Sequence, residues 1–292
     1  MTFDIYLKGA PLMTIENTIP DEFIAAQAKL ALLEDVGQQD LTADLIPINT
    51  LANASIITRE NATLCGQAWL EHVFKQLDPT IIIDWSFNDG EQMQANDVIC
   101  TLHGSARTLL TGERTAMNFI QTFSATATLA RHYADQVAGL AVQILDTRKT
   151  IPGLRTAQKY AVRCGGGYNH RMGLYDGVLI KENHINAAGS ITAAIEQARL
   201  LHQDIAIEVE VENFDELEQA LMAQADIILL DNFDIPALTK AVAVNQGRAK
   251  LEASGGITLD NVRAIAETGV DRISIGAITK DIRAIDLSMR FV

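Results

Sequence analysis

The sequence has few of the features that mark several large classes of protein. Its three cysteines, Cys65, Cys100 and Cys164, are far apart and show no C-x-x-C spacing, which fits a reducing compartment better than a disulfide framework. No apolar run approaches the ~20 residues that a membrane span needs. The opening MTFDIYLKGAPL lacks a basic stretch followed by an apolar one, so we expect a cytoplasmic protein with no signal peptide and no membrane partner.

Basic residues are also scarce. The 292 residues include 23 Lys and Arg against 37 Asp and Glu, a net charge of -14. Such a surface repels polyanions, so we expect no nucleic-acid partner. The sequence contains no P-loop, no dinucleotide-binding glycine motif, no H-E-x-x-H and no nucleophile elbow. Because the chain is acidic on average, a local cluster of lysine and arginine indicates a site for an anionic ligand.

The first third of the chain predicts an α+β domain over residues 1–112. We expect a helix over 21–34, capped by Asp21 and with an apolar stripe of Phe23, Ile24, Leu30 and Leu33. Short strands are predicted at 54–58, 80–85 and 97–102, with a helix at 70–77. Residues 107–137 contain almost no helix breakers and predict one long helix or two abutting ones.

From Gly139 onward, strand and helix patterns alternate. The predicted strands are 142–145, 177–180, 206–211, 226–230, 250–252 and 272–275. Alternation of this kind indicates parallel strands with right-handed helical crossovers. Periodicity alone leaves a doubly wound sheet open, but nearly every strand ends in polar or charged residues. Polar groups delivered to one rim are typical of a barrel enzyme, so we predict an α/β barrel over residues 113–285.

The last segment, DLSMRFV (286–292), places Leu287, Met289 and Phe291 on one face. This alternation predicts a strand. Because the segment lies beyond the last barrel strand, we expect it to return to the N-terminal domain and pack there.

Two basic segments follow predicted strands. In LDTRKTIPGLR, Arg148 and Lys149 stand at a strand exit, where they can bind carboxylates or phosphates; a solvated basic loop is the plainer alternative. In CGGGYNHRMGLYDGVLIKENHI, three glycines precede His170 and Arg171, and Lys181 ends the next strand. Glycines allow close approach of the backbone to a ligand, although a glycine-rich turn with a hydrogen-bonded histidine is also possible.

The remaining strand ends supply acids and small residues. IEVEVEN places Glu208, Glu210 and Glu212 on one face of a strand, and Asp231 ends the next. An edge strand with a solvated face would explain the pattern equally well, whereas acids inside a barrel need a cationic or metal partner. The last two strands end in LEASGGIT and ISIGAIT, whose free N–H groups suit a phosphate.

Together these segments resemble quinolinate phosphoribosyltransferase. The resemblance runs from about Leu30 to the end of the chain, and the segments that carry it, in order, are EDVGQQDLT, GERTAMNFIQTFS, LDTRKTIPGLR, KYAVRCGGGYNHRMGLYDGVLIKENHI, EVEVEN, ILLDNF, SGGITLDN and SIGAITK. It implies transfer of phosphoribose from phosphoribosyl pyrophosphate to quinolinate with loss of CO2, giving nicotinate mononucleotide and pyrophosphate for NAD biosynthesis. It also implies an N-terminal sandwich domain, an incomplete seven-stranded barrel and a homodimer with shared active sites.

The resemblance further implies roles for single residues. Arg148, His170, Arg171 and Lys181 would hold the carboxylates of quinolinate, with Arg114 supplied by the partner subunit. Lys149 and Lys181 would face the pyrophosphate, and Glu210 and Asp231 would serve the ribose and Mg²⁺. The 5′-phosphate would lie on Ser254, Gly255, Gly256, Ile275, Gly276 and Ala277, and Thr147 would be a further substrate-binding residue.

Two alternatives remain beside this function. One is a related phosphoribosyltransferase-like protein associated with molybdenum transport, which has a different acceptor. Loss of a carboxylate-binding arginine would favour it, but Arg114, Arg148 and Arg171 are all present. The other is a barrel that only binds a phosphorylated metabolite, which would not need both signs of charge.

Overall fold

An antiparallel sheet of four strands forms the N-terminal part of the computed structural model, which describes residues 19–292. The opening segment MTFDIYLKGAPL therefore lies outside the described residues. The strands stand in the order β12 (Leu287–Phe291), β1 (Leu51–Thr58), β5 (Val98–Ser105) and β3 (Ile82–Trp85). A two-stranded ladder of β2 (Ala62–Thr63) and β4 (Gln92–Met93) lies nearby. The expected return of the C-terminus is confirmed, since Met289 of β12 is paired with Ile56 of β1.

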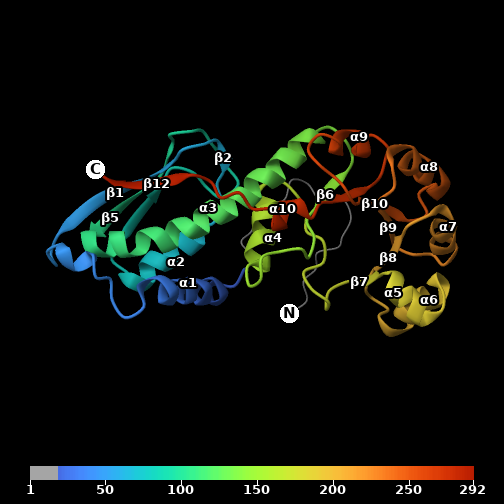
Figure 1. Ribbon diagram of the computed structural model, residues 1–292, viewed down its shortest axis with the longest axis horizontal. Helices are drawn as coiled ribbons and strands as arrows, with labels where there is room; N and C mark the ends of the chain where they lie inside the picture. The colour runs from blue at the N-terminus through green and yellow to red at the C-terminus, as the bar shows by residue number, and fades with distance from the viewer. Residues whose placement is uncertain (1–18) are drawn as a thin grey trace.

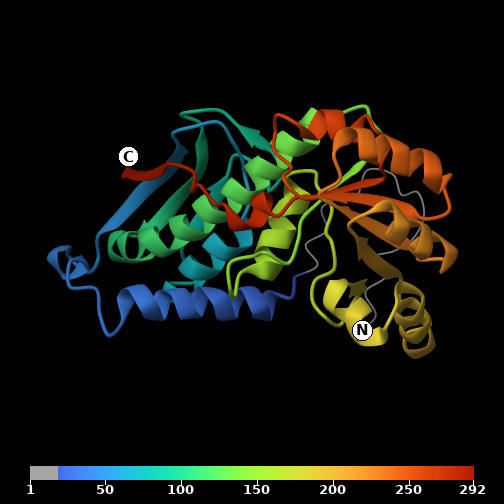
Figure 2. The same ribbon diagram turned by 45° about the vertical axis from the view of Figure 1, so that its right-hand side comes forward.

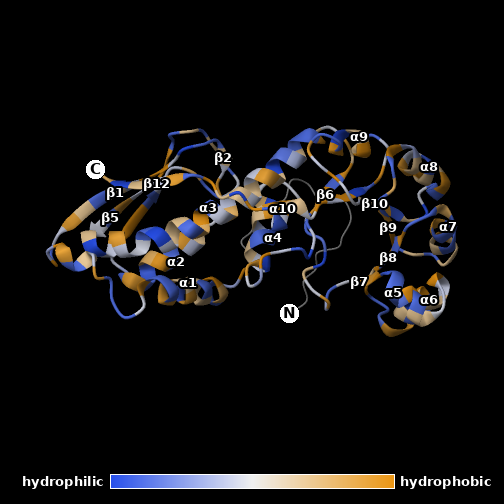
Figure 3. Cartoon of the chain, in the orientation of Figure 1, coloured by the Kyte–Doolittle hydropathy of each residue, from blue (hydrophilic) through white to orange (hydrophobic). Residues whose placement is uncertain are grey.

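Three helices and a 3-10 turn complete this part: α1 (Asp21–Val36), η1 (Ala43–Leu45), α2 (Gln67–Leu77) and α3 (Ala106–Gln136). Trp69 of α2 and Phe123 of α3 meet edge to face, with ring centroids 4.8 Å apart, in the middle of the N-terminal core. The single helix α3 confirms the long helix predicted over 107–137. It runs from the antiparallel sheet to the barrel (Figure 1) and carries apolar and polar residues along its whole length (Figure 3).

Helix α1 corrects two expectations. Pro20, and not Asp21, is the N-cap residue, and Asp21 lies in the first turn, 2.7 Å from His72. The buried face consists of Ile24, Ala28 and Leu32. Three of the four stripe residues are exposed instead: Phe23 by 36%, Leu30 by 70% and Leu33 by 59%. The predicted stripe contained only large apolar residues and left out Ala28, which lies on the face of α1 that packs against α2.

The second part is a parallel sheet with helices outside it (Figure 2). Its strands, in spatial order, are β6 (Gln143–Leu145), β11 (Arg272–Ser274), β10 (Lys250–Ser254), β9 (Ile227–Asp231), β8 (Ile207–Val211) and β7 (Val178–Ile180). All six predicted strands are confirmed. The helices between and after them are α4 (Arg155–Cys164), α5 (Glu182–Ala188), α6 (Ile191–Leu201), α7 (Phe214–Met222), α8 (Ile235–Asn245), α9 (Val262–Ala266) and α10 (Ala277–Lys280).

The expected seventh strand is reduced to one residue. Tyr168 forms a parallel bridge with Leu145 at the edge of β6, while β7 ends the sheet on the other side. In the described structure the barrel is therefore open between Tyr168 and β7. The expected domain division after residue 112 falls within α3, which is continuous across it. None of the described helices combines the length and apolar character needed to cross a membrane.

Candidate active site

The carboxyl ends of the six parallel strands deliver polar residues to one rim. Ser254 at the end of β10 is in register with Asp231 at the end of β9, and Glu210 of β8 is in register with Leu229 of β9. The other predicted residues follow the remaining strands: Thr147, Arg148 and Lys149 after β6, Lys181 after β7, Gly255 and Gly256 after β10, and Ile275, Gly276 and Ala277 after β11.

Four charged residues form one group on this rim. Lys181 Nζ makes an ion pair with Glu210 Oε2. Burial, and then the negative charge of Glu210, raise the pKa of Asp231, against the opposing fields of Lys181 and Lys149. These interactions place all four side chains within electrostatic reach of one another, so two carboxylates and two ammonium groups share the rim.

Two arginines form a separate cationic group. Arg171 Nη1 donates to the carbonyl of Gly177 at 3.0 Å. Burial, and then the positive charge of Arg148, lower the pKa of Arg171. Arg148 Nε is buried and has no hydrogen-bond partner within residues 19–292. A buried guanidinium nitrogen without a partner is costly, and two adjacent guanidiniums are the arrangement that carboxylates bind bidentately.

A buried ion pair fixes the segment that leads to Arg171. Asp146, directly after β6, pairs with Lys159 of α4, and both side chains are almost fully buried. Asp146 accepts hydrogen bonds from Asn169 Nδ2 at 2.6 Å and from the backbone N–H of His170 at 2.9 Å. Lys159 donates to the carbonyl of His170 at 2.8 Å. Burial raises the pKa of Asp146 and lowers that of Lys159, so this pair is a structural support that depends on both partners.

A buried cluster beneath the rim combines His170 and Glu208 with residues that the sequence did not point to. His170 Nε2 lies 2.9 Å from Glu208 Oε2 and 3.6 Å from Glu252 Oε1, and Arg272 Nη1 lies 3.8 Å from Glu252 Oε2. Burial, and then the charge of Glu208, raise the pKa of Glu252 to about 7. The alternation in EVEVEN placed Glu208 on the same face as Glu210, but nothing in the sequence pointed to Glu252 or Lys159.

The glycine loops follow β10 and β11, which lie between β6 and β9 in the sheet. Gly255 and Gly256 both have positive φ, 97° and 60°, and a Cβ on Gly255 would lie 2.1 Å from Asn232 Oδ1. Gly276 follows β11, and its backbone approaches the Lys149 side chain. These loops therefore place backbone close to the charged group, as a phosphate site requires.

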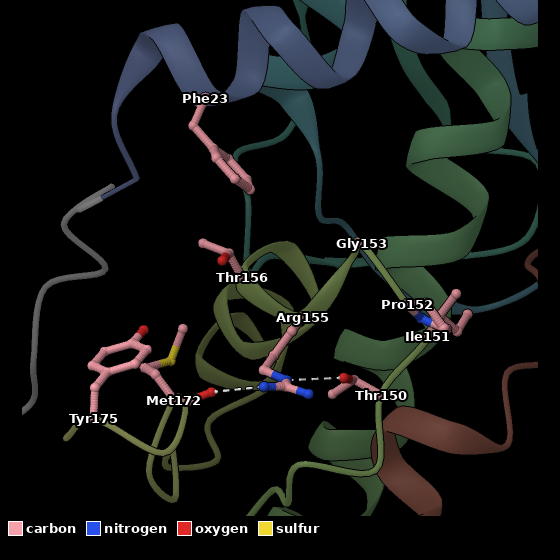
Figure 4. A pocket seen from close by; sticks show the side chains of 9 residues that line it. All are labelled: Phe23, Thr150, Ile151, Pro152, Gly153, Arg155, Thr156, Met172 and Tyr175. Atoms are coloured by element: carbon pink, nitrogen blue, oxygen red, sulfur yellow. Dashed lines mark hydrogen bonds between the residues drawn. The ribbon is translucent and has the colours of Figure 1, made fainter. Parts of the chain in front are cut away.

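A cavity of about 500 Å³ lies beside the predicted site residues and includes none of them. Its lining residues are Phe23, Thr150, Ile151, Pro152, Gly153, Arg155, Thr156, Met172 and Tyr175 (Figure 4). Arg155 donates from Nε to Thr150 Oγ1 and from Nη1 to the carbonyl of Met172, both at 3.2 Å (Figure 4). It thereby ties the loop that carries Arg148 and Lys149 to the loop that follows Arg171.

Arg114 is the one predicted residue that lies far along α3 from the rim. It is exposed and forms no salt bridge with any described residue. Gly165, which starts the loop toward His170, contacts α3 at Ala127. At 1.5 Å per residue, Arg114 is roughly 20 Å before that contact. The structure therefore does not bring Arg114 to the rim of its own chain.

Comparison with known proteins shows the family to which the chain belongs. The model of the quinolinate phosphoribosyl transferase N-terminal domain matches residues 40–124, and that of the C-terminal domain matches residues 126–290. The chain belongs to the quinolinate phosphoribosyltransferase family. The family resemblance noted in the sequence is thereby confirmed, together with the fold class.

Individual relatives agree with the family. A Mycobacterium leprae nicotinate-nucleotide pyrophosphorylase (carboxylating) is 38% identical over 280 residues, which cover 92% of this chain and 98% of the relative. A Nicotiana tabacum mitochondrial quinolinate phosphoribosyltransferase (decarboxylating) is 38% identical over 283 residues, covering 90% and 80%. The solved structure of the Francisella tularensis nicotinate-nucleotide pyrophosphorylase superposes with a TM-score of 0.93 at 47% identity, covering 96% of this chain and 99% of that one.

Proposed function

We propose that this member of the quinolinate phosphoribosyltransferase family transfers phosphoribose from phosphoribosyl pyrophosphate to the ring nitrogen of quinolinate. The products are nicotinate mononucleotide, pyrophosphate and CO2, as in NAD biosynthesis. The observation that carries the proposal is the separation of two groups on one barrel rim. The guanidiniums of Arg148 and Arg171 suit a dicarboxylate, and the mixed group around Lys181 and Glu210 suits a phosphorylated sugar.

The mixed group matches the charge that develops in such a transfer. Breaking the bond to pyrophosphate leaves positive charge on the anomeric carbon and negative charge on the departing oxygens. Glu210 and Asp231 would stabilise the first, and Lys149 and Lys181 the second. The 5′-phosphate would lie on the backbone of Ser254 to Gly256 and Ile275 to Ala277, with Thr147 beside it. No covalent nucleophile is required, and Cys164 is buried in the N-terminal core.

The donor set on the rim also fits Mg²⁺. Magnesium prefers carboxylate and phosphate oxygens and is usually bound through one or two carboxylates together with substrate phosphates. Glu210 and Asp231 supply two carboxylates, and burial followed by the charge of Glu210 raises the pKa of Asp231, so a cation near both would favour their charged forms. Bound there, Mg²⁺ would neutralise charge on the pyrophosphate.

We propose further that the active site is shared within a homodimer and that Arg114 acts on the partner's quinolinate. Arg114 is about 20 Å along α3 from its own barrel and points to solvent. Exposed apolar side chains occur in the same region: Leu110 of α3 precedes Arg114 by one turn, and Leu41 and Leu45 are 73% and 83% exposed in a loop that is held to α3. Thr111 holds that loop to α3 through Asp40 at 2.8 Å. Exposed apolar side chains near an exposed cation that forms no salt bridge with any described residue suit a second copy of the chain.

The decisive experiment incubates the protein with phosphoribosyl pyrophosphate, Mg²⁺ and quinolinate labelled at the 2-carboxylate. Nicotinate mononucleotide and labelled CO2 should appear in equal amounts. Nicotinate, which has only one carboxylate, is the matched control acceptor. It should be poorer by several orders of magnitude, because it leaves an arginine unpaired in a dry site. The proposed function would be wrong if kcat/KM were comparable for quinolinate and nicotinate, or if neither acceptor were turned over.

A further inference from the structure

Two buried thiols and a carboxylate form a group that the proposed reaction does not use. Cys65 precedes α2, Asp89 lies in the turn between β3 and β4, and Cys164 is the last residue of α4. Their potential ligand atoms all lie within 4.8 Å of one another. Because the two cysteines are far apart in the sequence, only the fold brings this group together.

The spacing of these atoms suits a tetrahedral metal ion. Bonds from Zn²⁺ of about 2.3 Å to sulfur and about 2.1 Å to oxygen separate neighbouring ligand atoms by roughly 3.6–3.8 Å. Closing the group around an ion therefore requires no pair of atoms to approach by more than about 1 Å. Two thiolates with one carboxylate favour Zn²⁺ over Mg²⁺, which prefers oxygen ligands alone.

Hydrogen bonds already hold the groups that would bind the ion. Ser124 of α3 accepts from the N–H of Cys65 at 3.0 Å and donates to its carbonyl at 3.2 Å. Asp89 Oδ1 accepts from two backbone N–H groups at the start of α2, at 3.0 and 3.3 Å, and Oδ2 accepts from the hydroxyl of Tyr160 at 2.9 Å. A carboxylate oxygen has two lone pairs, so Asp89 can bind an ion while Tyr160 keeps orienting it.

A cavity of about 470 Å³ reaches the group at Asp89 and Tyr160. Glu71 also lines this cavity, and no lysine or arginine is among its described lining residues. The cavity is therefore acidic and attracts cations. Cys65 and Cys164 are only 0% and 1% exposed, so an ion would enter past the carboxylate and be shielded from water on the side of the thiols.

A positive charge nearby balances the group. Two thiolates, a carboxylate and a divalent ion together leave one excess negative charge. Arg163 directly precedes Cys164, lies within electrostatic reach of Cys65, and has its guanidinium 5.8 Å from the centre of the Tyr160 ring. Its charge offsets the excess.

We propose that Cys65, Asp89 and Cys164 form a binding site for a thiophilic divalent cation such as Zn²⁺, with water as the fourth ligand. The bound ion would fasten the end of α4 to the loop that precedes α2. Since Cys164 stands directly before the glycine loop of the active site, the ion would stabilise the start of that loop. The site is separate from the Mg²⁺ site proposed at the rim, and it does not depend on the transferase function.

Cobalt(II) tests the site in the unmodified protein. Protein that has been stripped with a chelator and kept reduced with a phosphine is titrated with Co²⁺ in excess Mg²⁺. Thiolate-to-cobalt charge-transfer absorption should rise until Co²⁺ is equimolar with the protein and should vanish when Zn²⁺ is added. Zn²⁺ should also raise the melting temperature.

Two results of this titration would overturn the proposal. One is the absence of the charge-transfer band, because carboxylates such as those of the rim do not produce it. The other is a pair of cysteines that binds no Co²⁺ when reduced but forms a disulfide on mild oxidation, which would identify a redox pair.

Cysteine variants locate the ion. Cys65→Ala and Cys164→Ala should each weaken Co²⁺ binding by about a hundredfold or more, because each removes a thiolate ligand. Cys100 is the matched control, since it is equally buried but belongs to no such group within residues 19–292. Cys100→Ala should bind Co²⁺ as the wild type does. A band lost in Cys100→Ala, or kept at full strength in the other two variants, would place the ion elsewhere and refute the site.

The oxygen ligand has a conservative variant. In Asp89→Asn an amide oxygen can still accept from the two backbone N–H groups of α2, but it is a neutral and weaker ligand. We expect Co²⁺ affinity to fall by about tenfold or more, and Tyr160→Phe, which removes the orienting hydroxyl, to lower it by about tenfold. Without metal, both variants should melt near the wild-type temperature. Wild-type Co²⁺ affinity in Asp89→Asn would contradict the three-ligand site.

Discussion

Gly276 lies so close to Lys149 that a Cβ on the glycine would come within 3.0 Å of the lysine Cδ. The backbone of Gly276 has an ordinary φ of -67°, so alanine fits the backbone and only the lysine must move. We expect Gly276→Ala to leave the melting temperature unchanged and to reduce kcat/KM for phosphoribosyl pyrophosphate by roughly tenfold. In a Lys149→Ala background the same change should add little. Full additivity would mean that the glycine acts independently of Lys149.

Lys149 itself should contribute to the chemical step. If it offsets charge on the departing pyrophosphate, Lys149→Ala should reduce kcat by about 10²–10³-fold. Lys250 is a suitable control because it begins β10, at the opposite end of the barrel strands, and pairs there with Asp271. Lys250→Ala should leave kcat unchanged. A raised KM with normal kcat for Lys149→Ala would instead indicate that Lys149 binds ground state and transition state equally.

The shared site can be tested by mixing inactive proteins. When Arg114→Ala and Lys149→Ala subunits exchange, about half of the dimers are mixed. If Arg114 acts on the partner, each mixed dimer has one site with both residues intact, so roughly a quarter of wild-type activity should return.

A second mixture controls that experiment. Lys149→Ala and Lys181→Ala both alter barrel residues, so every mixed dimer keeps one lesion in each site and no activity should return. Exchange is verified with differently tagged subunits. If the Arg114→Ala mixture also stays inactive after verified exchange, Arg114 does not act in trans.

Glu252 should make the protein less stable as the pH rises. Its pKa is raised from 4.5 to about 7, so the folded protein retains a proton that the unfolded chain releases between these values, and stability falls over that window. Glu252→Gln removes the effect. We expect the free energy of unfolding of the variant, relative to that of the wild type, to rise by on the order of 3 kcal/mol between pH 4.5 and 7. Urea unfolding at several pH values measures this difference.

The exposed Glu267 is the control for the pH series. It forms an i,i+4 salt bridge with Arg263 and is half exposed. The difference in unfolding free energy between Glu267→Gln and the wild type should therefore stay the same across this pH window. If the difference between Glu252→Gln and the wild type is also independent of pH, the pKa of Glu252 is not raised in the folded protein.

Local patterns were sufficient for the strands of the barrel. The segments 142–145 and 226–230, apolar except for Gln143 and Asp226, are strands in the structure, because a strand covered on both faces is largely apolar. The pattern failed for α1, where Ala28 is buried and Leu30 is exposed. A helix that leaves leucines exposed cannot be oriented from its hydrophobicity, since the side with large apolar residues is not the one that packs within the chain.

The site residues also divide into those that the local sequence predicted and those that only the fold brought together. The sequence by itself determined which residues carry charge and that they stand at strand ends, because alternation and strand exits are properties of the local chain. Only the tertiary structure decided that Lys159 and Glu252 lie beneath them, since helix α4 must fold back to bring Lys159 to Asp146 and strand β10 brings Glu252 to His170 from a distant part of the sequence. It also decided that His170 faces inward to Glu208. A histidine has two nitrogens on a rotatable ring, so its partners depend on which groups the fold brings within hydrogen-bond distance.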